Sequence, residues 1–482
     1  MMPAVYALIA IALPWAVTAL WLRYLVPSSP PLDWPTALGY GFFIGMYLTV
    51  LLLHLTDALG LGLHTNLVLG VWLLAAVGVI FVVGKHHWTV GAATGTTPAP
   101  TTASPVPSRI GRWLWWGLLA LIMIRLGIIA AEVALRPVMP WDAWTVWLFR
   151  SRAWFEQATL VPFLSAAQWL TAEQPHTFTT AAHHYPRTVS IIPTWVALNA
   201  GTWHEPLALA PWVAALTAML LAVYGQVQRL GGTSLDAILV TYLLISIPMV
   251  TVHTALAGYA ELWTAATIVL AAVSLWVWRL HKEHLQMLLA LPLLAALPTL
   301  KLEGSVWLVA LIAGMLLWLL KPRTVLLLAV VAMSGIAAWA ALGGITVEVP
   351  GVGTIMLRPD QITIPGLVSL GLGPEPDALR PLLSALFLYA NWHLLWFVAL
   401  ALSPLALYRS VRDPKIRGPA YTIAIMLGML LALFLLSDAS QWVISQTAVN
   451  RLLLHITPLL LVFLWMTVRL PGLPLATHSS LR

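Results

Sequence analysis

Runs of about twenty apolar residues, separated by shorter polar stretches, make up most of this chain. A helix needs about 20 residues to cross hydrocarbon, whereas the strands of a membrane barrel are short and alternate in polarity. We therefore expect an all-α polytopic membrane protein with about 13 transmembrane helices. The expected spans are 3–22, 37–56, 66–84, 113–135, 205–228, 235–253, 259–279, 286–300, 304–320, 324–343, 382–408, 418–437 and 451–469.

A stretch rich in Thr, Pro and Ala between the third and fourth spans shows no apolar period (Gly91–Ser108). Such composition is typical of a disordered linker, which we place at 91–112. The linker predicts a division into an N-terminal three-helix module (1–90) and a ten-helix module (113–470), followed by a cytoplasmic tail (471–482).

Lysine and arginine gather at the ends of the odd-numbered spans, and cytoplasmic loops are the ones that carry such an excess. The pattern predicts an N-terminus outside and a C-terminus in the cytoplasm, in an integral protein of the bacterial cytoplasmic (inner) membrane. The two long segments 136–204 and 345–380 then lie outside, and the β-like pieces of the second predict a structured loop. The basic ends are Arg23, Lys85, Arg229, Arg279, Lys321, Arg409 and Arg469.

Composition narrows the chemistry. The chain is 60% hydrophobic and 9% charged, which excludes an ordinary soluble domain. It has no cysteine, so disulfides, thiolate nucleophiles and cysteine-bound metals are excluded. The net charge of +7 suits a protein held against anionic lipid and does not imply a nucleic-acid partner.

The first outer segment begins with an acid between tryptophans, Asp142 in the sequence WDAW. Apolar residues at helical spacing follow from Trp144 to Phe155, which predicts a juxtamembrane helix lying in the interface. Asp142 is interpreted either as a solvated or helix-capping acid, or as a general base or metal ligand.

Four arginines lie on the side where positive charge is normally depleted: Arg136, Arg150, Arg152 and Arg187. They are either interfacial anchors whose charges reach the headgroups or ligands of an anion. A phosphate at the membrane surface is the natural partner because guanidinium binds phosphate bidentately.

Charges also mark the outer ends of two later spans, at Glu261 and at Lys301 with Glu303. Lys301 and Glu303 are two residues apart, so on one helix they point to different faces and need not pair. Lys301 is interpreted either as a phosphate ligand or as the partner of Glu261 in a structural ion pair.

Histidines supply further candidates. His183 and His184, followed by Tyr185, are either solvated or part of a His/Asp metal site. Arg451 and His455 stand at the outer end of the last span, where an anionic ligand or a lipid phosphate would explain the arginine.

Taken in order, these features resemble the GT-C superfamily of membrane glycosyltransferases, over roughly residues 113–470. The resemblance rests on WDAW with Asp142, on the YP pair Tyr185–Pro186, and on GYAELW with Glu261. It also rests on TLKLEG at Thr299–Gly304, in which Leu300 separates the Thr and Lys that are adjacent in the family, and on NRLLLHITP from Asn450. Three spans and the linker precede the acidic loop, unlike much of the family, and Ala143 stands where many members carry a second acid.

The resemblance implies transfer of a sugar from a polyprenyl-phosphate donor to an acceptor hydroxyl on a glycan, lipid or protein, by an inverting displacement on the non-cytoplasmic face. It implies Asp142 as base and Glu261 as its support, with no metal requirement carried over, so the cofactor stays unknown and a divalent metal stays open. The implied phosphate ligands are Arg150, Arg152, Arg187, Lys301 and Arg451, and the implied acceptor or metal contacts are His183, His184, Tyr185, Glu303 and His455. A transporter or flippase of a lipid-linked or anionic solute is the alternative, and a membrane scaffold is a third.

Overall fold

The computed structural model describes residues 2–26, 32–92, 108–173, 176–349, 353–365 and 368–469. Most of the predicted linker (93–107) and the predicted tail (471–482) lie outside these ranges.

The chain is a mostly helical polytopic membrane protein. Ten helices of the described residues are long and apolar enough to cross a membrane. Because a run of this length satisfies all its backbone hydrogen bonds internally, each forms a helix wherever hydrocarbon surrounds it. The ten are α1 (Met2–Tyr24), α2 (Trp34–Ala58), α3 (Thr65–Ala92, apolar to Gly84), α4 (Arg109–Leu135), α8 (Glu205–Arg229), α11 (Glu261–His281), α13 (Leu302–Leu319), α14 (Pro322–Ala341), α17 (Pro414–Leu435) and α19 (Val449–Arg469).

Three of the thirteen expected spans take another form. The span expected at 235–253 is broken into α9 (Ser234–Ser246) and α10 (Pro248–Ala255), which meet at 63°. Pro248 explains the break, since it lacks a backbone N–H and forces the preceding residue out of the helical region. The span expected at 286–300 is α12 (His284–Leu300), a helix of 17 residues. The number 13 therefore stays a prediction.

The third, 382–408, is wrong as a single helix. It comprises α15 (Leu379–Leu383), a π-helical turn (Ser384–Leu388) and, after a break, α16 (Leu395–Arg412). Within the break His393 adopts a φ of 49°, a left-handed conformation that a continuous helix does not contain. A local turn thus interrupts an apolar run whose length alone suggested a span.

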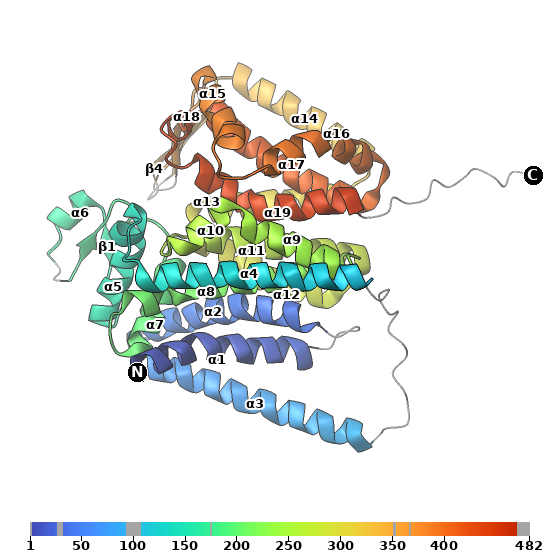
Figure 1. Cartoon of the computed structure of the whole chain (residues 1–482). Helices are drawn as coiled ribbons and strands as arrows, with labels where there is room; N and C mark the ends of the chain where they lie inside the picture. Colours follow the sequence, from blue (N-terminus) through green and yellow to red (C-terminus); the bar gives the residue numbers. More distant parts are fainter. Residues whose placement is uncertain are drawn as a thin grey trace, which may run out of the picture. The chain divides into compact units, whose positions relative to one another are not determined.

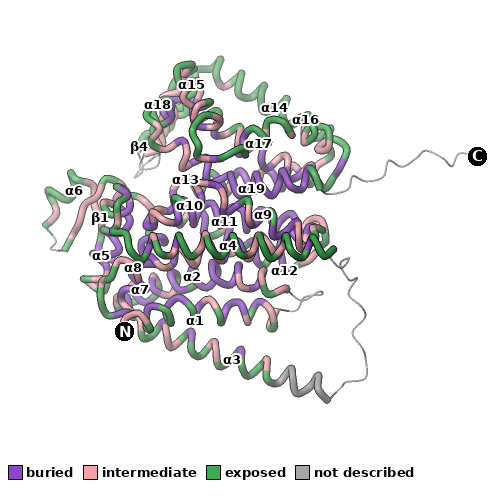
Figure 2. The backbone as a smooth tube through the Cα atoms, viewed as in Figure 1, coloured by how far each residue is buried: buried purple, intermediate pink, exposed green. Residues whose placement is uncertain are grey.

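The chain folds as two compact units, Met1–Leu308 (unit 1) and Val309–Arg482 (unit 2). In unit 1, α1, α2, α8, α11 and α12 run side by side, with α4 and α9 along another face (Figure 1). Small residues let these helices approach closely. A Cβ on Gly39 would lie 2.6 Å from a backbone atom of Ala218 in α8, and one on Gly41 would lie 2.7 Å from Ala19 in α1. The buried centre of this unit is α11 (Figure 2).

The two N-terminal helices are integral to unit 1. Trp195 of α7 (Thr188–Ala200) donates its indole N–H to the carbonyl of Ala10 at 2.9 Å, and Tyr40 donates to the carbonyl of Leu270 in α11 at 2.8 Å. Packing divides the chain after Leu308, whereas linker composition predicted a division at 91–112. Long-range contacts of this kind leave no trace in local composition.

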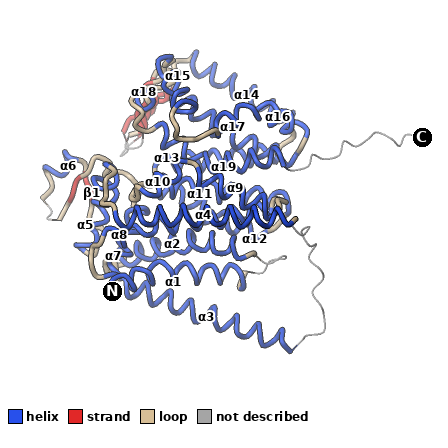
Figure 3. Tube along the Cα trace, in the orientation of Figure 1, coloured by secondary structure: helices blue, strands red, loops and turns tan. Residues whose placement is uncertain are grey.

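Unit 2 contains the second of the two long segments predicted to lie outside, and the expectation of structured β-like pieces there is confirmed. Strands β3 (Ile345–Val349), β4 (Gly353–Arg358), β5 (Gln361–Ile364) and β6 (Val368–Gly371) form an antiparallel meander in that order (Figure 3). The meander is tied to the end of α17, since the Gly373 amide donates to the carbonyl of Leu436 at 3.1 Å.

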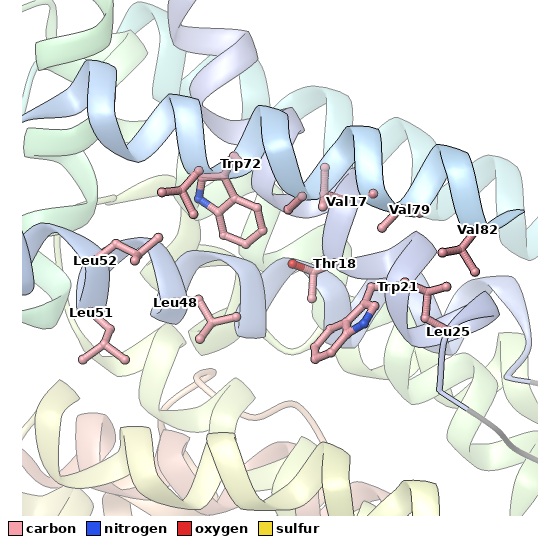
Figure 4. A pocket seen from close by; sticks show the side chains of 13 residues that line it. Val17, Thr18, Trp21, Leu25, Leu48, Leu51, Leu52, Trp72, Val79 and Val82 are labelled. Atoms are coloured by element: carbon pink, nitrogen blue, oxygen red, sulfur yellow. The ribbon is translucent and has the colours of Figure 1, made fainter.

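An apolar pocket of about 510 Å³ lies between α1, α2 and α3 (Figure 4). Its α1 side chains, Val17, Thr18 and Trp21, come from the C-terminal half of that helix and Leu25 follows it, whereas α7 contacts α1 at Ala10. The pocket therefore lies away from the end of unit 1 that holds the charged groups described next.

Candidate functional site

A buried ion cluster lies where α12 gives way to α13. Lys301 is 3% exposed, and its ammonium contacts Glu261 Oε1 at 3.1 Å and Glu303 Oε1 at 2.9 Å. The ion pair with Glu261, one of the two interpretations of Lys301, is present. Lys301 and Glu303, which helical spacing did not require to pair, form a second ion pair. Lys301 is extended (φ −158°, ψ 155°) rather than helical, so the helical spacing argument does not apply to it.

Glycine at position 304 makes this break between helices close-packed. A Cβ there would collide with the carbonyl oxygen of Leu297, and the Gly304 amide donates to the carbonyl of Lys301 at 2.9 Å. The turn thus needs glycine for space. It fixes the ammonium between the two carboxylates, of which Glu261 is fully buried at the start of α11.

The ion cluster changes the expected role of Lys301. Two carboxylates face one ammonium, so its charge is already matched inside the protein. A bound phosphate beside this cluster would be repelled by its net negative charge, since two carboxylates face one ammonium. Lys301 therefore suits the positioning of Glu261 and Glu303 better than the binding of a donor phosphate.

Asp142 lies at the start of a π-helical turn (Ala143–Trp147) that leads into α5 (Leu148–Gln157). Of the interpretations given to it, capping of the following helix is not supported, since its side chain makes no capping hydrogen bond. Turns of π-helix inside helices are frequent at functional sites. The side chain is half-buried, and it lies in the segment that follows the end of α4 at Leu135.

A glycine brings the Asp142 turn to the ion cluster. Gly258, with a φ of 110°, packs so closely that a Cβ on it would lie 2.7 Å from the Cβ of Ala143. Ala143 follows Asp142, and Gly258 precedes Glu261 by three residues. The segments WDAW and GYAELW, far apart in sequence, are therefore in contact.

Arg150 is a structural residue of this region. It is 1% exposed, and its guanidinium donates to the carbonyls of Tyr185 at 2.9 Å and Pro186 at 3.3 Å. Its guanidinium carbon also lies 5.2 Å from the ring of Trp154. These contacts hold the segment that leads into α7 rather than presenting the charge to solvent.

Arg187 follows that segment directly and is exposed. Its neighbour Thr188 makes a hydrogen bond between hydroxyls with Thr299 at 3.0 Å, two residues before Lys301. The start of α7 therefore meets the end of α12, and Arg187 lies at the same end of unit 1 as the ion cluster. Of the arginines expected to bind phosphate, it is the one whose surroundings suit that role best.

The electrostatics of the 183–187 segment are positive. Burial, and then the charge of Arg187, lower the pKa of Arg150 to about 10. Burial, with smaller effects from His183 and Arg150, lowers the pKa of His184 below its ordinary value. Positive groups here disfavour one another, which is the condition that a bound anion relieves.

Other expectations for the first outer segment need correction. Arg136 and Arg152 have carboxylate partners in the chain, Glu132 at 2.8 Å and Glu156 at 2.9 Å, so neither needs an external anion. Helix α5 exists as expected, but Trp147, directly before it, and Trp154 on it are each 1% exposed. They pack inside the protein because the loop folds back over them, as the indole of Trp154 donating to the carbonyl of Val161 shows.

The two histidines form part of a ring contact series. The ring of His184 lies 5.1 Å from that of His183 and 5.1 Å from that of Tyr185, measured between centroids. The ring of Tyr185 in turn lies 5.6 Å from that of Trp147. Among the residues that the structure describes, no three His, Asp or Glu side chains are grouped to hold a metal ion.

Arg451 and His455 lie in α19 of unit 2, where His455 is fully buried.

A buried polar network escaped the sequence analysis. Gln226 donates to the hydroxyl of Tyr40 at 2.8 Å and to Gln286 Oε1 at 2.8 Å, and Ser274 donates to Tyr40 at 2.7 Å. These four side chains join α2, α8, α11 and α12. A signal existed, since Asp33, Tyr40, Tyr47 and His54 repeat every seven residues along α2.

Comparison with known proteins adds no family: no family model, no curated protein and no solved structure matches this chain.

Proposed function

We propose that the chain is a glycosyltransferase of the bacterial inner membrane, similar to the GT-C superfamily, that takes a sugar from a polyprenyl-phosphate donor. One observation carries the proposal. The turns that carry Asp142, the buried cluster of Glu261, Lys301 and Glu303, and Arg187 meet at one end of unit 1, through Ala143 with Gly258 and Thr188 with Thr299. That end combines acids for an acceptor hydroxyl with a cation for a leaving phosphate.

In the proposed reaction the acceptor oxygen attacks the anomeric carbon from the face opposite the phosphate, which inverts that centre. Its proton passes to Asp142 as the new glycosidic bond forms. The bond between sugar and phosphate breaks with its electron pair on the phosphate, whose developing charge Arg187 stabilises. Glu303 orients the acceptor, since its Oε2 is buried and makes no hydrogen bond to a described residue. Lys301 and Glu261 position Glu303.

The substitution Asp142→Asn tests the base. We expect transfer in membranes supplied with lipid-linked sugar to fall about a hundredfold or more, since a general base contributes that much. Release of polyprenyl phosphate is the readout. Glu156→Gln is the matched control because it removes an exposed carboxylate of the same loop. Near-full transfer by a folded Asp142→Asn variant would remove Asp142 from this role.

The substitution Arg187→Gln tests the phosphate ligand. We expect the donor KM to rise about tenfold or more with little change in the acceptor KM, as for a lost charge-assisted hydrogen bond. Arg187→Lys should recover part of the loss. A change confined to the acceptor KM would contradict the assignment.

A flippase of a lipid-linked solute is the second candidate. The broken span α9–α10 and the polar network around Tyr40 favour it, because transporters bind substrates at discontinuous helices and need polar groups within the membrane. Proteoliposomes with a labelled polyprenyl-phosphate sugar separate the two functions. Transbilayer movement without release of the sugar would support the flippase and exclude the transferase.

A further inference from the structure

Arg125 is a charged side chain in the middle of a membrane span. It stands ten residues before the end of α4 at Leu135 and sixteen after its start at Arg109. In the ten candidate spans, every other Asp, Glu, Lys or Arg lies within three residues of an end. At 1.5 Å per residue, Arg125 is about 15 Å from the nearer end of its helix. It therefore lies near the centre of the hydrocarbon.

The part of the chain that the structure describes supplies no partner for this charge. Arg125 makes no hydrogen bond, ion pair or ring contact to any residue that the structure describes. Arginine keeps its charge in proteins, so it cannot escape the cost of hydrocarbon by losing a proton. A mid-membrane charge of this kind marks a functional site unless it is paired.

Arg125 lies at the border between the packed and the lipid-facing sides of α4. Ile122 and Ile129, at helical spacing on either side of it, are 4% and 5% exposed. Ile124 and Ile128, on the next face, are both 58% exposed. Arg125 itself is half-buried, so a ligand can reach it from the lipid without entering the protein core.

The elements beside Arg125 also suit a polar ligand. Helix α4, drawn in cyan in Figure 1, packs against α8, α9 and α10. Met123 and Leu126 line a pocket with Thr241 of α9, so this turn of α4 lies level with the last two turns of α9. That helix ends at the break, where the hydroxyl of Ser246 is buried and makes no hydrogen bond within the described chain.

We propose that Arg125 binds the phosphate of an anionic phospholipid that leans into the membrane beside α4. The guanidinium offers a fork of N–H donors that matches phosphate oxygens, on a stem long enough to carry the charge along the helix surface. The site is separate from the Glu261–Lys301–Glu303 cluster, and the proposal does not depend on the transferase.

Lipid retention by the full chain tests this site. The wild type and Arg125→Leu are purified from the same membranes, exchanged into nanodiscs of phosphatidylcholine with phosphatidylglycerol, and examined by native mass spectrometry. We expect the variant to lose about tenfold or more in retained phosphatidylglycerol, as for a bidentate charged pair. Equal retention would overturn the proposal. Misfolding is not expected, because leucine inserts into hydrocarbon more readily than arginine.

Two variants and two further ligands sharpen the result. Arg125→Lys keeps the charge without the fork and should lose most of the retention, whereas Arg109→Gln, at the exposed start of α4, should keep it. A loss with Arg109→Gln equal to that with Arg125→Leu would mean non-specific attraction and would overturn the site.

Inorganic phosphate should not displace the lipid, and displacement would overturn a lipid ligand. Displacement by polyprenyl monophosphate at lower concentration than phosphatidylglycerol would overturn the phospholipid as the occupant.

Discussion

Lys301 illustrates how a single backbone conformation determines what a residue does. On a continuous helix its side chain would point away from Glu303, yet its extended φ and ψ turn it toward both acids. The pairing is also a strong constraint on folding. Removing one partner of a buried ion pair leaves a charge without compensation, whereas removing both at once does not.

We therefore expect Lys301→Met to destabilise the protein by about 3–5 kcal/mol, and Lys301→Met combined with Glu261→Gln to recover a large part of that loss. Thermal unfolding in detergent measures both. Additive effects of the two substitutions would contradict the ion pair. Arg323→Gln, an exposed charge in α14, is the control and should be neutral.

His184 provides a pH dependence whose sign is set by its environment. Burial, His183 and Arg150 lower its pKa below the ordinary 6.5. As the pH falls, the imidazole is therefore protonated more readily in the unfolded chain than in the folded chain. Stability should be unaffected well above pH 6.5 and should fall as the pH drops below that value. His184→Gln should flatten this part of the curve of unfolding temperature against pH. An unchanged slope would contradict the assignment.

At the scale of elements, close contacts between backbones bring distant segments together. The sequence places Asp142 at the end of one span and Glu261 at the start of another. Only the missing side chain of Gly258 lets the two turns touch through Ala143. Helical periodicity could not have predicted this contact, because it describes one face of one helix and not its neighbour.

Gly258→Ala should separate these turns. The new Cβ lies too close to Ala143, and the φ of 110° is strained for alanine, so we expect a loss of about 3 kcal/mol in stability and a fall in transfer. Unfolding temperature and release of polyprenyl phosphate measure the two effects. Gly127→Ala in α4 is the control, since a Cβ there meets open space and should be neutral or slightly stabilising. Equal behaviour of the two variants would refute the contact.

For the whole molecule, the N-terminal helices complete the packing of unit 1. Helix α2 contributes Tyr40 to the polar network and lies against α8 through Gly39. Without it, the amide of Gln226 and the hydroxyl of Ser274 would lose their shared partner inside the protein. Such loss is costly because buried polar groups need hydrogen bonds.

A chain lacking residues 1–92 should therefore fail to fold, as judged by size-exclusion chromatography in detergent. Supplying 1–92 and 93–482 as separate polypeptides should restore a monodisperse complex. A monodisperse 93–482 alone would instead support the independent modules suggested by the linker.

The predicted orientation has a direct test, because the chain contains no cysteine. Ala167→Cys lies in the first long outer segment and His281→Cys at a predicted cytoplasmic end, and both positions are exposed. A membrane-impermeant maleimide applied to intact spheroplasts should label the first and not the second. The opposite labelling would reverse the topology and place the candidate site in the cytoplasm.

The sequence by itself determined the class of the protein and the residues of interest. Apolar runs matched to the thickness of hydrocarbon can only be helices, and charges at their ends stand out against that background. Asp142, Glu261, Lys301 and Arg187 were identified in this way.

Tertiary structure decided the partners of these residues. Thr188 meets Thr299 across 111 residues, and Lys301 meets Glu261 across 40. It also turned Arg150 inward to two carbonyls and gave Arg152 a carboxylate, which is why we propose Arg187 as the phosphate ligand of this segment. Periodicity defines the faces of each helix, but which faces meet depends on close packing among helices, and a sequence pattern does not contain that information.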